Sequence, residues 1–167
     1  MQHRPTAILY TSHTGFTARY ASMLARMSRI PAYDTNDIRE HLPKGTAVIY
    51  LGWVCAGKIK GLGRARRQYD VRAVCAVGMA PEEGETMAHI RKENRLEELP
   101  FFYLRGGYDH QKVKGIYRLM MNAMGKSMEK KAAQDARARL LLETMKKGAN
   151  WVAPEALAPV EQWLNRQ

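Results

Sequence analysis

A short run of hydroxyl side chains around one glycine is the part of this sequence best suited to binding a phosphate. The run reads Ser12-His13-Thr14-Gly15-Phe16-Thr17. Its hydroxyls can each donate a hydrogen bond to a phosphate oxygen, and Gly15 has no Cβ to hold the backbone away from a ligand. The run contains no lysine and matches neither GxxxxGK[ST] nor GxGxxG, which favours a mononucleotide phosphate held without a metal. The alternative is an ordinary hydroxyl-rich turn that caps a helix.

Cysteine and histidine side chains offer less chemistry. Cys55 and Cys75 form no CxxC pair, which argues against a zinc ribbon or a disulfide scaffold. We expect two reduced thiols, with Cys75 in the core and Cys55 as a small packed residue rather than a redox group. The histidines lack the short spacing of a metal site, and they are His3, His13, His41, His89 and His110. We therefore expect no metal.

The hydroxyl-rich run lies between an expected strand and an expected helix. Thr6 to Tyr10 is a short apolar run that predicts a buried strand. From Phe16 onward apolar side chains recur at helical spacing, which predicts an amphipathic helix ending near Ile30-Pro31. The amide groups and the positive end of such a helix are suited to a phosphate. This position favours the phosphate site over the simple cap.

Strands and helices alternate along the following part of the chain. The expected strands are Ala32 to Thr35, Thr46 to Leu51, Val71 to Val77 and Pro100 to Leu104. The expected helices are Asp37 to Leu42, the basic stretch Lys58 to Tyr69, and Glu85 to Leu96. This alternation is typical of an α/β doubly wound parallel sheet, in which ligands bind beyond the carboxyl ends of the strands.

A longer helical stretch follows Tyr108. An apolar stripe predicts one helix over Val113 to Met124, and a second helical run is expected from Ser127 to Lys147. Between Arg105 and Lys147 there are eleven basic and four acidic residues, which leaves a net charge of +7. We expect a final helix within Ala153 to Leu164.

Size and charge limit the class of protein. With 167 residues and no apolar stretch of about 18 residues, we expect a single domain, residues 1–167, that does not span a bilayer. No signal sequence is evident at the start, so a cytoplasmic location is expected. The net charge of +11 favours an anionic partner: an acidic small molecule, an anionic membrane surface or nucleic acid. Nucleic acid is the least expected, because aromatic residues do not interleave the basic runs.

The motifs together resemble a known superfamily. The flavodoxin phosphate loop, [ST]-x-T-G-x-T, is matched by Ser12, Thr14, Gly15 and Thr17. More narrowly, the chain resembles the flavodoxin-type protoporphyrinogen IX oxidases over nearly its whole length. That resemblance is carried by Ile49-Tyr50-Leu51-Gly52 with Ala56-Gly57-Lys58, by Phe102 to Asp109, and by the Met-rich basic helix Ile116 to Met128.

The resemblance implies a flavodoxin-like three-layer sandwich with a five-stranded parallel sheet, order 2-1-3-4-5, and an extra helical insertion after the fifth strand. It implies FMN as cofactor, with the flavin ring near the loops Gly52 to Gly57 and Gly78 to Gly84. Trp53 is the first candidate for stacking on the ring and Tyr108 the second; the alternative is that Trp53 only covers the edge of the core. The expected FMN contacts are Ser12, His13, Thr14, Gly15, Phe16, Thr17, Gly52, Trp53, Val54, Ala56, Gly57, Gly78, Met79 and Tyr108.

Three functions stay open at this point. The first is an FMN oxidoreductase that oxidises protoporphyrinogen IX or a similar anionic substrate with a quinone acceptor; no side-chain acid or base can be named for it. The second is an electron-transfer flavodoxin serving a protein partner, although such carriers are usually acidic. The third is a flavin-free basic interaction module. The basic helices near 112–131 could be a solvated face, an entrance for an anionic substrate, or a contact with the inner face of the membrane.

Overall fold

The computed structural model describes residues 4–37 and 42–167, and it contains two compact units. The first, which we call the sheet unit, comprises the chain up to Gly106 together with Val152–Gln167. The second, the helical unit, comprises Gly107–Trp151. The helix predicted over Asp37 to Leu42 falls mainly on residues 38–41, outside the described ranges.

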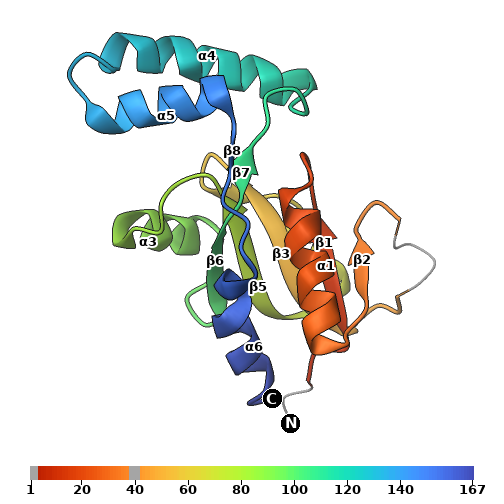
Figure 1. Cartoon of the computed structure of the whole chain (residues 1–167). Coiled ribbons are helices and arrows are strands. Elements are labelled where there is room, and N and C mark those ends of the chain that lie inside the picture. Colours follow the sequence, from red (N-terminus) through yellow and green to blue (C-terminus); the bar gives the residue numbers. More distant parts are fainter. Residues whose placement is uncertain (1–3, 38–41) are drawn as a thin grey trace. The chain divides into compact units, whose positions relative to one another are not determined.

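The sheet unit is an α/β structure built on a mostly parallel sheet (Figure 1). The parallel strands lie in the order β2-β1-β3-β5-β6, and β4 pairs antiparallel with β3. Six strands are therefore present where five were predicted, and the order in chain numbering differs from 2-1-3-4-5 because β4 intervenes. The strands are β1 (Ala7–Thr11), β2 (Ala32–Asp34), β3 (Ala47–Cys55), β4 (Lys58–Ile59), β5 (Asp70–Gly78) and β6 (Phe101–Arg105).

Helices cover both faces of this sheet, which explains why its central strands are apolar at nearly every position. On one face α1 (Phe16–Ser28), the 3-10 helix η2 (Pro154–Leu157) and α6 (Ala158–Leu164) pack on alternate residues of the strands. On the other face α2 (Leu62–Gln68) and α3 (Gly84–Glu93) pack on the intervening residues.

The helix predicted over Lys58 to Tyr69 is wrong in its first part. Lys58 and Ile59 form β4, and the helix begins only at Leu62, after Gly61 at φ +82°. The physical reason is that β3 continues past Gly52 to Cys55 and turns back on itself, which buries the Ile59 side chain against the sheet. A buried side chain at this position gains more from strand pairing than from an isolated turn of basic helix.

The helical unit consists of two helices and a short two-stranded ribbon. The helices are α4 (Gly115–Lys131) and α5 (Ala136–Lys147), and the ribbon pairs β7 (Gly107–Tyr108) antiparallel with β8 (Ala149–Asn150). The second helix was predicted to start at Ser127, which is wrong, because α4 continues to Lys131. Asp135 is the N-cap of α5, and its side chain accepts hydrogen bonds from the amides of Arg137 and Ala138.

No helix in the described ranges is long and apolar enough to cross a membrane.

Cys75 lies fully buried on β5, as the sequence predicted, and this burial raises the pKa of its thiol from 9.0 to about 12. The unfolded chain therefore loses the proton at a lower pH than the folded chain does. The contribution of the neutral Cys75 thiol to the free energy of unfolding is therefore complete below about pH 9, and it is lost as the pH rises towards 12. Above pH 9, the free energy of unfolding should fall more steeply for the native chain than for Cys75→Ala, by up to about 1.4 kcal/mol per pH unit. Urea unfolding at several pH values measures this difference.

Cys55→Ala is the matched control, because Cys55 is only half-buried. It should keep the steep decline of the native chain. Parallel pH profiles for the native chain and Cys75→Ala would contradict the assignment of a neutral buried thiol.

Candidate functional site

The hydroxyl-rich run forms a tight turn at the start of α1. Gly15 is the N-cap of the helix and has φ +100°, a conformation that favours glycine. No atom lies within 4 Å of the point where a Cβ on Gly15 would be, so the turn opens to free space at this residue. The Ser12 hydroxyl accepts hydrogen bonds from the amides of Gly15 at 3.2 Å and Ala18 at 3.3 Å. Ser12 thus acts as a cap, while its own hydroxyl proton remains available for donation.

The other residues of the run differ in their exposure. His13, Thr14 and Phe16 are half-buried, whereas Thr17 is only 1% exposed. The amides of Phe16 and Thr17 belong to the first turn of α1 and have no acceptor within the helix. These backbone groups are better placed for an anion than the Thr17 hydroxyl, which the sequence had suggested as a donor.

The turn lies at the topological switch point of the sheet, where successive strands are added on opposite sides of β1. From β1 the chain continues to β2 on one side, and β3 is the neighbour on the other side. Thr11 at the end of β1 lies opposite Gly52 on the parallel strand β3. In open α/β sheets, ligands bind at such a crevice beyond the carboxyl ends of the strands.

A pair of stacked rings joins the turn before α1 to the end of β3. The imidazole of His13 lies on the indole of Trp53, with ring centroids 5.0 Å apart and an interplanar angle of 21°. The ammonium group of Lys60 lies 5.9 Å from the centroid of the same indole. Sequence reasoning predicted Trp53 near the site but missed Lys60, because Lys60 is brought there only by the reversal of the chain after β3.

Trp53 is carried on a β-hairpin formed by β3 and β4. Cys55 pairs with Lys58, and the two residues between them, Ala56 and Gly57, have φ +48° and +76°. Two successive positive φ values are typical of a type I′ turn, which suits the twist of a hairpin. The predicted ligand residues Ala56 and Gly57 are therefore turn residues of this hairpin.

Two of the predicted glycines have structural reasons of their own. A Cβ on Gly52 would lie 2.5 Å from the side chain of Ile59 and 2.7 Å from the carbonyl oxygen of Lys60, so the hairpin packs over β3 at a glycine. Gly57 has φ +76°, a conformation that favours glycine. Packing and backbone conformation thus explain the two glycines without reference to a ligand.

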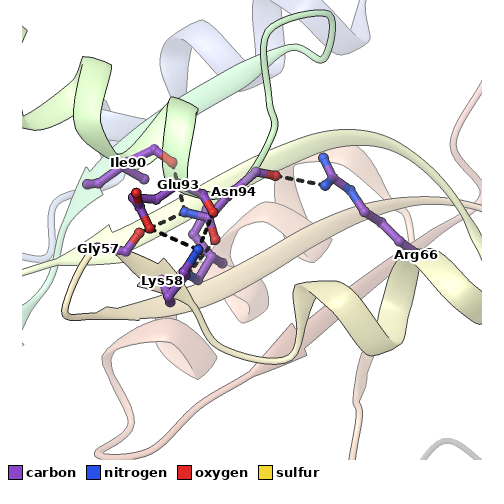
Figure 2. A network of polar contacts seen from close by, with 7 residues as sticks. Gly57, Lys58, Arg66, Ile90, Glu93 and Asn94 are labelled. Atoms are coloured by element: carbon purple, nitrogen blue, oxygen red, sulfur yellow. Dashed lines mark hydrogen bonds and ion pairs between the residues drawn. The ribbon is translucent and has the colours of Figure 1, made fainter.

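Asn94, at the end of α3, fixes the hairpin to the helix layer (Figure 2). Its side-chain oxygen accepts from the amide of Ile59 at 2.9 Å, and its side-chain nitrogen donates to the carbonyls of Gly57 at 2.7 Å and Ile90 at 2.8 Å. The backbone carbonyl of Asn94 accepts from the Arg66 guanidinium at 2.7 Å. Burial lowers the pKa of Arg66.

An ion pair adds to this network at the surface. The ammonium group of Lys58 lies 2.9 Å from the carboxylate of Glu93, and it also donates to the Glu93 carbonyl. Hydrogen bonding and charge from Lys58 lower the pKa of Glu93. The buried amide of Asn94 holds the hairpin more firmly than this exposed pair, because exposed ion pairs contribute little.

At the carboxyl end of β5 the carbonyl groups are already hydrogen-bonded. The Gly78 carbonyl accepts from the amide of Gly106 at 2.8 Å, and the Met79 carbonyl accepts from the Arg105 guanidinium at 3.3 Å. A Cβ on Gly78 would collide with the hydroxyl of Tyr103, whose pKa burial raises to about 12. Each of these carbonyl oxygens keeps a second lone pair, so the two hydrogen bonds do not exclude a ligand contact at Gly78 or Met79.

Tyr108 is the one predicted contact that lies in the helical unit, where it forms part of β7 and is buried. Burial raises the pKa of its hydroxyl. The remaining predicted contacts, including Val54 on the hairpin, lie in the sheet unit.

Comparison of the chain with models of protein families, with curated proteins and with solved structures found no match. Within the described ranges, no group of three or more His, Cys, Asp or Glu side chains is placed to hold a metal ion.

Asn94→Ala should lower the free energy of unfolding by about 3 kcal/mol, because it leaves the buried Ile59 amide and the Gly57 carbonyl without their partner. Urea denaturation measures this loss. Asn165→Ala is the matched control, since Asn165 is exposed at the end of α6, and it should change stability by less than about 0.5 kcal/mol. Equal effects of the two substitutions would show that Asn94 does not hold the hairpin.

Proposed function

We propose that this chain is a flavodoxin-like FMN-binding protein. The observation that carries the proposal is the stack of His13 on Trp53, because it joins the turn before α1 to the end of β3 at the switch point of the sheet. A phosphate at the turn and a planar ring near Trp53 then belong to one crevice. The order of the five parallel strands, with β4 set aside, is the order that the flavodoxin arrangement has.

The turn before α1 fits a phosphate group in four respects. Gly15 leaves open space where a side chain would lie, and the first turn of α1 contains no acidic residue. The amides of Phe16 and Thr17, the hydroxyl proton of Ser12 and the hydroxyl of Thr14 would hold the phosphate oxygens. The positive end of the helix adds a favourable field for the negative charge.

The flavin ring would lie beside Trp53. His13 is stacked on the indole and the Lys60 ammonium group lies over the same ring system, so the flavin ring would take the place of the imidazole. The ammonium group of Lys60 near this indole would favour negative charge on the reduced ring and so raise its reduction potential. When bound, FMN supplies hydride and electron transfer; the protein supplies binding, orientation and the electrostatic environment.

Within this class, we propose an oxidoreductase that removes hydrogen from an anionic substrate similar to protoporphyrinogen IX and passes electrons to a quinone. The net charge of +11 supports this choice, because it attracts the propionate groups of such a substrate. It also disfavours the role of an electron-carrier flavodoxin, since such carriers are usually acidic. No side-chain acid or base is assigned to the reaction.

A second candidate is a flavin-free module that binds through its basic surface. The two hydrogen bonds that the Ser12 hydroxyl accepts favour this alternative, because they are the bonds of a simple helix cap.

Titration with FMN distinguishes the FMN-binding protein from the flavin-free module. The quenching of flavin fluorescence measures binding. Thr14→Ala combined with Gly15→Val should weaken FMN binding at least tenfold, about 1.4 kcal/mol, because valine is strained at φ +100° and its side chain would fill the open space. The matched control is Thr144→Ala combined with Gly63→Val, the same two types of substitution made away from the turn. Thr144 lies on α5, and Gly63 lies on α2, where it has no positive φ and no close neighbour.

Failure of the native chain to take up FMN would favour the flavin-free module, and an unchanged affinity in the Thr14/Gly15 variant would remove the phosphate site. With FMN bound, turnover of protoporphyrinogen IX with a quinone distinguishes an oxidase from an electron carrier.

A further inference from the structure

Helix α4 carries an apolar stripe that the other residues of the helical unit leave exposed. Ile116, Leu119 and Met120 are 63%, 65% and 45% exposed, and their spacing places them on one face of the helix. Sequence periodicity had grouped Ile116 and Met120 in one apolar stripe with Tyr117 and Met121. The half-buried side of α4 is instead formed by Tyr117, Met121, Met124 and Met128.

The two helices of the unit approach closely on that other side. A Cβ on Gly125 of α4 would lie 3.3 Å from the terminal methyl of Met145 on α5, so this glycine permits the close contact. On α5, Ala138 is buried, while Leu140 is 58% exposed. The helical unit is therefore a hairpin of helices that keeps several large aliphatic side chains on its surface.

The same unit is strongly basic. Residues 107–151 contain ten Lys or Arg and four Asp or Glu, which leaves a net charge of +6. Two of the acidic side chains are already engaged, Asp109 with Lys112 and Asp135 as the cap of α5. Lys126 and Lys130 follow the apolar stripe along α4 at helical spacing, so the face is apolar in its first half and basic in its second.

We propose that this face of α4 docks on an anionic membrane surface. Ile116, Leu119 and Met120 would enter the region between headgroups and acyl chains, and Lys126 and Lys130 would contact lipid phosphates. Two other partners fit less well: a second copy of this chain would bring two units of charge +6 together, and nucleic acid would leave the aliphatic stripe exposed. This inference is independent of the FMN site.

Co-sedimentation with vesicles tests the proposal. The native chain should bind vesicles of equal parts phosphatidylglycerol and phosphatidylcholine, should bind pure phosphatidylcholine vesicles much more weakly, and should lose binding as salt rises above about 0.1 M. Ile116→Ser combined with Leu119→Ser should reduce the partition coefficient at least about tenfold. Lys126→Gln combined with Lys130→Gln should reduce it by roughly tenfold or more.

Matched controls come from the sheet unit. Met27 on α1 is 39% exposed, so Met27→Ser controls for loss of an exposed apolar side chain, and Arg64→Gln with Arg67→Gln on α2 controls for loss of charge. Both controls should bind as the native chain does, and circular dichroism should show unchanged helix content in every variant.

Three results would overturn the proposal: no binding to anionic vesicles, equal loss of binding in the controls, or sedimentation showing a dimer that Leu119→Ser dissociates. FMN affinity measured on the same variants should be unchanged, so a failure here is distinct from a failure of the proposed flavin site.

Discussion

The hydrogen bond between Thr11 Oγ1 and the hydroxyl of Tyr50, 2.7 Å long, ties the carboxyl end of β1 to the middle of β3. Thr11 Oγ1 also lies 2.8 Å from the hydroxyl of Thr35 just after β2, and the Tyr50 hydroxyl donates to the carbonyl of Lys60. One small polar cluster thus connects the ends of β1 and β2, the middle of β3 and the chain leaving β4. Burial raises the pKa of Tyr50, so the hydroxyl stays a donor in this cluster throughout the physiological range.

This cluster determines how the chain around Trp53 is arranged. Gly61 passes so close to Thr11 and Tyr50 that a Cβ there would collide with both hydroxyls. The chain that follows the hairpin is therefore held against the strand ends, and Lys60 remains near Trp53. The same polar contacts therefore hold the strands β1 and β3 together and position the residues of the candidate site.

The sequence was sufficient to predict the five parallel strands, because a strand that is buried on both faces of a sheet is a continuous run of apolar residues. The hairpin at Ala56 and Gly57 was not predictable from periodicity, since β4 has only two residues and Ala56 is an unusual turn residue. The role of Asn94 depends on a contact with residues more than thirty positions earlier, Gly57 and Ile59, which no local pattern encodes. Helical spacing likewise located α4, but the structure divides the apolar stripe of the sequence between a half-buried side and an exposed side, because an amphipathic stripe does not say what covers it.

The pairing of β7 with β8 has a consequence for the origin of the helical unit. Gly107 lies opposite Asn150, so the chain enters and leaves this unit through two neighbouring, antiparallel segments. An element attached by such a narrow neck can be gained, lost or exchanged in evolution while Gly106 and Val152 stay in place in the rest of the molecule. The helical hairpin can therefore diverge under its own selection, at a rate independent of the sheet that carries it.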